Sequence, residues 1–129
     1  MNDYERGIEQ FKKMVGEDRV EAFQERFNSV FSDFGNEVMS VVAGRFWTRS
    51  GIDLKTRSLC SIAILAALGR VSALKLNFEM ALNNGATKEE IFEALMQVAV
   101  YAGFPAAWDA FLMLEEVIKE SQERDGSRA

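Results

Sequence analysis

The feature that most constrains the fold is how rarely this chain uses residues that break helices. Its 129 residues include one proline, Pro105, and nine glycines, so long runs contain neither. A sheet of many short strands needs turn signals roughly every 8–12 residues. Their scarcity therefore favours an all-α fold. The hydrophobic content of 48% is sufficient for the core of one globular domain.

The spacing of apolar residues predicts seven helices joined by short loops. The clearest pattern lies in residues 17–34, where apolar side chains recur every three or four positions between polar ones. The predicted helices cover residues 3–15, 17–34, 36–47, 54–69, 73–83, 88–102 and about 105–120. Short connections favour antiparallel packing in a single domain over residues 1–129. Residues 121–129 are expected to form a frayed polar tail.

Side chains at the predicted boundaries support these limits. Asp53 and Ser72 are suitable N-caps for the helices that follow them. Thr87 and Glu90 have the spacing of a capping box. Gly85, after two asparagines, suits a left-handed cap at the end of the preceding helix.

The stretch from Leu59 to Leu68 is apolar on nearly every side of its helix, which predicts a central and buried position. Cys60 lies in this stretch and is expected to be a small core residue. It is the only cysteine, so no disulfide forms within one chain and nothing indicates secretion.

Histidine is absent, which removes the usual general base and the commonest metal ligand. With one cysteine and no histidine, we expect no metal site. The polar start is unlike a signal peptide. The longest apolar run, LCSIAILAAL, is about half of the roughly 20 residues that a membrane span needs. We therefore expect a soluble, cytoplasmic protein with no membrane partner.

Charge is unevenly distributed along the chain. The net charge of −5 argues against nucleic acid as a partner, because phosphate contacts need a basic surface. Residues 45–75, however, carry six basic groups and one acidic group. This segment predicts a local anion site. The alternative is that its cations pair with acidic residues from the flanking segments.

Three blocks of the sequence read FWTRSGIDLKTRSLCSIAILAALGR, LNNGATKEEIFEALMQVAVYAGFPAAWDAF and LEEV. Together they resemble the carboxymuconolactone decarboxylase family, within the alkylhydroperoxidase D-like superfamily. The resemblance covers residues 47–116 as a family core, whereas residues 1–46 match only in length and helical character. It implies an all-α, alkylhydroperoxidase D-like domain that forms a homo-oligomer, a hexamer or trimer.

The same resemblance implies a function. Decarboxylases of the family convert 4-carboxymuconolactone without a cofactor, in aromatic catabolism. The expected partner is therefore a small-molecule carboxylate, and no cofactor is expected. Oligomerisation has separate support in the ten Phe, two Trp and two Tyr, several of which are expected to be buried between subunits. A well-filled monomer core is the alternative.

The chain departs from the family at positions that carry chemistry. Asn77 stands where the family usually has histidine, and Arg45 stands where glutamate is common. Asparagine does not exchange a proton near neutral pH. The two cysteines of the peroxidase pattern would fall at Arg70 and Ala73, so dithiol peroxidase activity is not expected.

The resemblance and the basic segment together select the candidate catalytic residues Arg57, Asn77 and Tyr101. Arg57 has a planar group that suits a carboxylate or a developing enolate. Tyr101 is one candidate proton donor, and Glu79 is another if it faces inward. Alternative roles are a structural ion pair for Arg57, a polar filler for Asn77 and aromatic core for Tyr101.

Three further residues are candidates for substrate binding. Arg45 and Arg49 would hold a second carboxylate, and Trp47 would form a pocket wall. The alternatives are surface charge for the arginines and aromatic core for Trp47. The sequence is also compatible with two functions other than that of a decarboxylase. One is a diverged member that lacks decarboxylase activity and binds or converts another small organic acid, and the other is a non-enzymatic oligomeric module.

Overall fold

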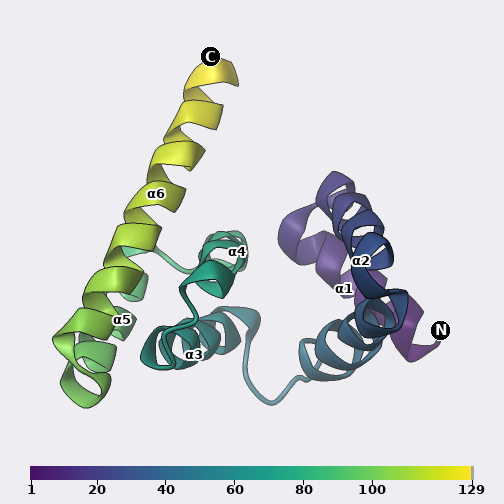
Figure 1. Cartoon of the computed structure of the whole chain (residues 1–129), viewed down its shortest axis with the longest axis horizontal. Helices are drawn as coiled ribbons and strands as arrows, with labels where there is room; N and C mark the ends of the chain where they lie inside the picture. Colours follow the sequence, from purple (N-terminus) through teal and green to yellow (C-terminus); the bar gives the residue numbers. More distant parts are fainter. Residues whose placement is uncertain (129) are drawn as a thin grey trace. The chain divides into compact units, whose positions relative to one another are not determined.

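A computed structural model describes residues 1–128, which contain six α-helices, one π-helix and no strand (Figure 1). The all-α prediction is confirmed. The chain divides into two compact units, Met1–Asp53 and Leu54–Ala129, and each is described by itself. That both belong to one domain stays a prediction. No helix in the described part of the chain is long and apolar enough to cross a membrane.

The first unit contains α1 (Asp3–Val15), α2 (Glu17–Glu37) and the π-helix η1 (Val38–Phe46). The side chain of Asn2 caps α1 by accepting a hydrogen bond from the Glu5 amide at 2.8 Å. The predicted break between residues 34 and 36 is absent, because α2 runs directly into η1. The wider π-turn has no simple sequence signal and was not predicted.

Helix α1 packs against η1 through two glycines. A Cβ atom on Gly7 would collide with the backbone carbonyl of Met39, and one on Gly44 would collide with that of Asp3. Both positions therefore require the absence of a side chain. This close approach buries Met39 and Ala43 in the core of the first unit.

A row of phenylalanine rings begins on α1 and continues along α2. Ring centroids lie 5.4 Å apart between Phe11 and Phe23, and 6.4 Å apart between Phe23 and Phe27. Phe31 has non-helical backbone angles, so α2 is kinked there. After the kink, Phe34 lies 6.2 Å from the ring of Phe27. The 3–4 spacing predicted from the sequence therefore becomes an aromatic row that bends with the helix.

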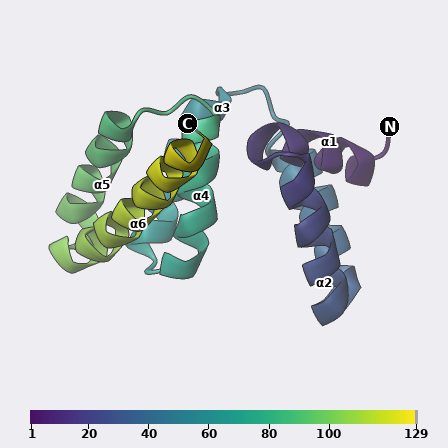
Figure 2. The same cartoon turned by 90° about the horizontal axis from the view of Figure 1, so that it is seen from above.

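The second unit contains α3 (Leu54–Ala67), α4 (Val71–Asn83), α5 (Lys88–Ala102) and α6 (Phe104–Arg128). The predicted capping box is confirmed: Glu90 N–H donates to Thr87 Oγ1 at 3.0 Å, and Thr87 N–H donates to Glu90 Oε1 at 2.9 Å. The left-handed cap is confirmed as well, because Gly85 has a φ of 99°. The α5–α6 connection is the single residue Gly103, which folds the two helices into a hairpin (Figure 2).

Two boundary predictions are wrong. Helix α4 begins at Val71 with Arg70 at the N-cap position, so Ser72 lies inside the helix and does not cap it. Helix α6 continues to Arg128 instead of ending near residue 120. The Glu, Gln and Arg residues there are good helix formers, which explains the extension. Fraying of the tail stays a prediction, and Ala129 lies outside the described residues.

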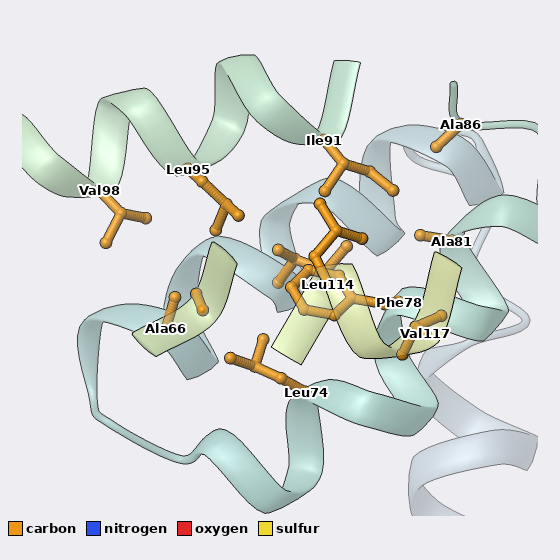
Figure 3. Close-up of a cluster of buried hydrophobic side chains, with 12 residues drawn as sticks. Ala66, Leu74, Phe78, Ala81, Ala86, Ile91, Leu95, Val98, Leu114 and Val117 are labelled. Carbon is orange, nitrogen blue, oxygen red and sulfur yellow. The ribbon is translucent and has the colours of Figure 1, made fainter. Parts of the chain in front are cut away.

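The core of the second unit is made by inward-facing residues of all four helices and by Ala86 of the α4–α5 connection (Figure 3). Its buried members are Ile62, Ala66, Leu74, Phe78, Ala81, Ala86, Ile91, Leu95, Val98, Ala110, Leu114 and Val117. Helix α3 contacts α4, α5 and α6, which confirms its central position.

The prediction that α3 is buried on every side is wrong. Ile62 and Ala66 face the core, whereas Ile64 and Leu68 are exposed. Cys60 is also exposed, so it is not a core residue. The reason is geometric: the three partner helices of α3 cover one face, and residues spaced by four on the opposite face stay outside.

Candidate functional site

The six predicted site residues divide between the two units. Arg45, Trp47 and Arg49 belong to the first unit, and Arg57, Asn77 and Tyr101 belong to the second. The structure thus defines two local groups, which are described in turn. Their convergence into one site stays a prediction.

The first group lies at the C-terminal end of η1. The Trp47 side chain is buried, with 9% exposed, and its amide caps η1 by donating to Val42 O at 3.0 Å. Arg45 is exposed, and its Nε lies 4.0 Å from Oδ2 of Asp3 on α1. Arg49 is exposed in the segment that follows η1. Trp47 therefore has the core role given as its alternative, and the two guanidinium groups lie at the surface.

Arg57 lies in the first turn of α3, where it is half-buried and its Nε atom is buried. The adjacent Ser58 is fully buried and has two hydrogen bonds. Its hydroxyl donates to Leu54 O at 2.8 Å and accepts from Asn84 Nδ2 at 3.0 Å. The start of α3 is thereby fixed to the end of α4, which restricts the backbone that carries Arg57.

An ion pair joins the starts of α3 and α5. Lys55 Nζ lies 3.1 Å from Glu90 Oε2. The backbone hydrogen bond from Thr87, followed by the hydrogen bond from Lys55, holds the pKa of Glu90 below its ordinary value of 4.5. A carboxylate near a helix N-terminus is also favoured by the helix dipole. Glu90 is therefore a structural carboxylate, and it neutralises one cation of the basic segment.

Asn77 lies on α4 and is half-buried. Its Nδ2 donates to the carbonyl of Ala73 on the same helix at 2.8 Å, which leaves the amide oxygen as the group able to accept from a ligand. Tyr101 is 84% exposed near the end of α5, so the core role given as its alternative is wrong.

Glu79 is buried, with 8% exposed, and it is the only buried charged residue among those that the structure describes. It follows Asn77 by two residues on α4. The inward orientation on which its candidacy as a proton carrier depended is therefore observed. A buried carboxyl group is shielded from solvent, which suits proton transfer to a bound substrate.

A charge cluster beside Glu79 was not predicted from the sequence. Lys75 Nζ lies 3.1 Å from Glu120 Oε1, which joins α4 to α6. This hydrogen bond, together with the negative charges of Glu120, Glu116 and Glu79, raises the pKa of Lys75 above its ordinary value of 10.5. The sequence did contain a signal for this cluster. Lys75 and Glu79 are four residues apart, as are Glu116 and Glu120, and residues with this spacing are neighbours on one helix face.

Chemically, these groups provide a guanidinium near a fixed helix start, a buried carboxyl group and a polar amide. Arginine binds and neutralises carboxylates. A carboxyl group delivers or accepts protons. No group of three or more Cys, Asp or Glu residues within residues 1–128 is arranged to hold a metal ion. The chain thus contains groups for acid chemistry on small carboxylates.

Comparison with known proteins gives a consistent result. The model of the carboxymuconolactone decarboxylase family matches residues 32–116. A protein of Acinetobacter baylyi named 4-carboxymuconolactone decarboxylase is 39% identical over 123 residues, which cover 93% of this chain and 92% of that protein. A protein of Metarhizium robertsii named nitrosuccinic acid decarboxylase npaB is 32% identical over 118 residues, which cover 91% of this chain and 82% of that protein.

Proposed function

The chain belongs to the carboxymuconolactone decarboxylase family, and from this premise we propose that it is a cofactor-free decarboxylase of a small organic acid. The observation that carries the proposal is the 39% identity to a 4-carboxymuconolactone decarboxylase along nearly the whole of both chains. The second relative is also named a decarboxylase, although its substrate differs. Both names support the same reaction class, and 4-carboxymuconolactone is the first substrate to test.

Decarboxylation requires the protein to stabilise the electron pair left on the substrate and to deliver a proton. When the bond to the carboxyl carbon breaks, carbon dioxide leaves and the electron pair stays on the substrate. The pair is stabilised if it delocalises onto an oxygen that faces a positive group. A proton must then reach the carbon. In this proposal Arg57 supplies the positive charge, and Glu79 delivers the proton and regains one from water.

The remaining candidates have supporting roles. In this proposal the amide oxygen of Asn77 orients the substrate, and Tyr101 is the alternative proton donor. Arg45 and Arg49 bind a second carboxylate, and Trp47 supports the backbone that carries them. The exposed apolar side chains of the second unit support a homo-oligomer. The family resemblance implies that it is a hexamer or trimer.

A second candidate is a diverged decarboxylase that acts on another small acid. Asn77 in place of the family's usual histidine favours it, and so does the match to a nitrosuccinic acid decarboxylase. A non-enzymatic oligomeric module is the third possibility. Its only support is the lack of a strong catalytic group.

The direct test is release of carbon dioxide from purified protein with 4-carboxymuconolactone and, separately, nitrosuccinic acid. Turnover of the lactone supports the first candidate, and turnover of nitrosuccinic acid alone supports the second. No turnover of either acid, together with no binding by calorimetry, would support the non-enzymatic module. The double variant Asn77→His with Arg45→Glu restores the family residues. If only this variant releases carbon dioxide from the lactone, the chain has diverged from the strict activity.

A further inference from the structure

Helix α4 carries a lysine one turn before the buried carboxyl group of Glu79. Lys75 and Glu79 are four residues apart, so they are neighbours on one face of the helix, with Cβ atoms roughly 5–6 Å apart. Glu79 is 8% exposed, whereas the side chain of Lys75 is 44% exposed. This face of α4 therefore places a buried acid next to an ammonium group that is in contact with solvent.

Helix α6 restricts the position of this ammonium group. Helices α4 and α6 pack against each other, and Lys75 Nζ lies 3.1 Å from Oε1 of Glu120. A lysine side chain is flexible when nothing binds it. The ion pair limits this freedom, so the charge of Lys75 stays near Glu120 on α6 and near Glu79 on its own helix.

The charged groups around Glu79 come from α4 and from the two helices packed against it, α3 and α6. They are Lys75 on α4, Asp109, Glu116 and Glu120 on α6 near α4, and Lys55 and Arg57 in the first turn of α3. Lys75 interacts through its charge with Glu79 and with the two glutamates of α6. Its pKa is raised above 10.5, chiefly by the hydrogen bond to Glu120, so it is an ammonium group throughout the neutral pH range.

A positive charge beside Glu79 affects proton delivery, because the proposed function makes Glu79 the proton donor. When the O–H bond of the carboxyl group breaks, the proton bonds to the substrate carbon and the electron pair stays on Glu79 as a carboxylate. The carboxylate then regains a proton from water. An ammonium group close by lowers the free energy of the carboxylate, and the negative charge of Glu120 opposes that effect.

We propose that Lys75 is a positioning residue that stabilises the carboxylate form of Glu79 during proton delivery, and that Glu120 limits this effect by holding the ammonium group on α6. The inference rests on the proposed function in taking Glu79 as the proton donor. The effect of Lys75 on the charge of Glu79 is a property of the folded chain and is measurable without substrate. The alternative is a structural role, in which the Lys75–Glu120 pair joins α4 to α6 and does not affect Glu79.

Substitutions at the two ends of the ion pair separate these roles. Lys75→Met and Glu120→Gln both break the contact between α4 and α6, but the first removes a positive charge near Glu79 and the second removes a negative charge. Titration of Glu79 is followed by ¹³C NMR of the side-chain carboxyl carbons, and its signal is the one that is missing in Glu79→Gln. We expect the titration midpoint of Glu79 to rise by about 0.5 pH unit in Lys75→Met and to fall by a smaller amount in Glu120→Gln.

Two control variants should keep the wild-type midpoint. Lys75→Arg retains the positive charge, and Lys119→Met removes an exposed lysine of α6 that pairs with Glu115. If circular dichroism shows that Lys75→Met does not fold, Lys75→Gln replaces it, because glutamine removes the charge and still reaches Glu120 with a hydrogen bond. An unchanged midpoint without the Lys75 charge, or shifts of the same sign in the Lys75 and Glu120 variants, overturns the proposal.

The kinetic test uses whichever acid the protein decarboxylates. A proton donor must be protonated, so kcat falls as pH rises through its titration. The alkaline limb of kcat should move up by about 0.5 pH unit in Lys75→Met and down in Glu120→Gln, with KM unchanged. If the limb stays fixed while the NMR midpoint moves, the role of Lys75 in proton delivery is overturned. If no acid is decarboxylated, the proposed function fails, and the NMR titration alone supports or overturns the effect of Lys75 on Glu79.

Discussion

The hydroxyl of Ser58 accepts a hydrogen bond from Nδ2 of Asn84 at 3.0 Å, and this contact ties the first turn of α3 to the end of α4. The two residues are 26 positions apart in the sequence. Arg57 precedes Ser58, so the hydrogen bond restricts the backbone beside a candidate catalytic residue. A buried hydroxyl that supports a neighbouring site should affect both stability and activity.

We predict that Ser58→Ala lowers the free energy of unfolding by about 1–3 kcal/mol, because the half-buried amide of Asn84 loses the buried hydroxyl that accepts its hydrogen bond. Urea unfolding followed by circular dichroism, at one fixed protein concentration, measures the change. Ser61→Ala is the matched control. Its hydroxyl donates to Arg57 O on the same helix at 3.1 Å and should contribute less than about 0.5 kcal/mol. Equal losses in the two variants would show that the Ser58–Asn84 contact contributes nothing particular.

Glu90 should make stability depend on pH in the acid range. Its pKa in the folded protein is lowered from 4.5, chiefly by the Thr87 backbone hydrogen bond and then by Lys55. The resulting stabilisation is fully present above pH 4.5 and is lost as pH falls through the folded pKa. Glu90→Gln should therefore flatten the decline in thermal midpoint below pH 4.5. Glu89→Gln, outside the capping box, should keep the wild-type slope, and a Glu90→Gln slope like wild type would contradict the assignment.

Lys75 should make stability depend on pH in the alkaline range, where stability is lost as pH rises. Its folded pKa is raised above 10.5, chiefly by the hydrogen bond to Glu120. This contribution is present below pH 10.5 and is lost as pH rises through the folded pKa. Lys75→Met should therefore show a smaller loss of thermal midpoint above pH 10.5 than wild type. Lys13→Met is the control on an exposed site of α1; if it changes the alkaline limb as much, the effect is not specific to Lys75.

The close approach of α1 and η1 predicts an unusual response to alanine. Alanine normally stabilises a helix interior relative to glycine by roughly 0.5–1 kcal/mol. At Gly7 its Cβ would meet the carbonyl of Met39, so Gly7→Ala should instead destabilise by about 1–3 kcal/mol. Gly126→Ala, where nothing lies within 4 Å, should be neutral or stabilising. Urea unfolding separates the two; a stabilising Gly7→Ala would contradict the contact.

The proposed chemistry predicts different kinetic effects for its two main residues. Glu79→Gln keeps the shape of the side chain and removes its ability to exchange a proton, so kcat should fall by about 10²-fold or more with little change in KM. Arg57→Lys keeps the charge and removes the planar fork, so kcat should fall by about 10-fold because the developing negative charge is stabilised less well. Arg26→Lys, at an exposed position of α2, is the control. Steady-state assays on whichever acid is turned over measure these effects, and wild-type kcat in Glu79→Gln would remove Glu79 from the mechanism.

The candidate site could be predicted from the sequence only residue by residue. The family resemblance selected Arg57 and Asn77, and the structure places both on the second unit. The family resemblance did not show that Tyr101 is exposed or that Glu79 is buried. Side-chain periodicity gives the relative direction of neighbours on a helix, but burial depends on which other helices cover that direction.

By itself, the sequence determined the helical class and most helix limits, because these depend on neighbouring residues. The Thr87–Glu90 capping box and the turn at Gly85 are contacts within a few positions of the chain, and both were predicted correctly. Only the tertiary structure decided which face of α3 is covered and therefore that Cys60 is exposed. It also decided the close approach at Gly7, the burial of Glu79 and the exposure of Phe104 and Trp108. These features arise from contacts between segments far apart in the sequence, and local periodicity contains no information about which segments meet.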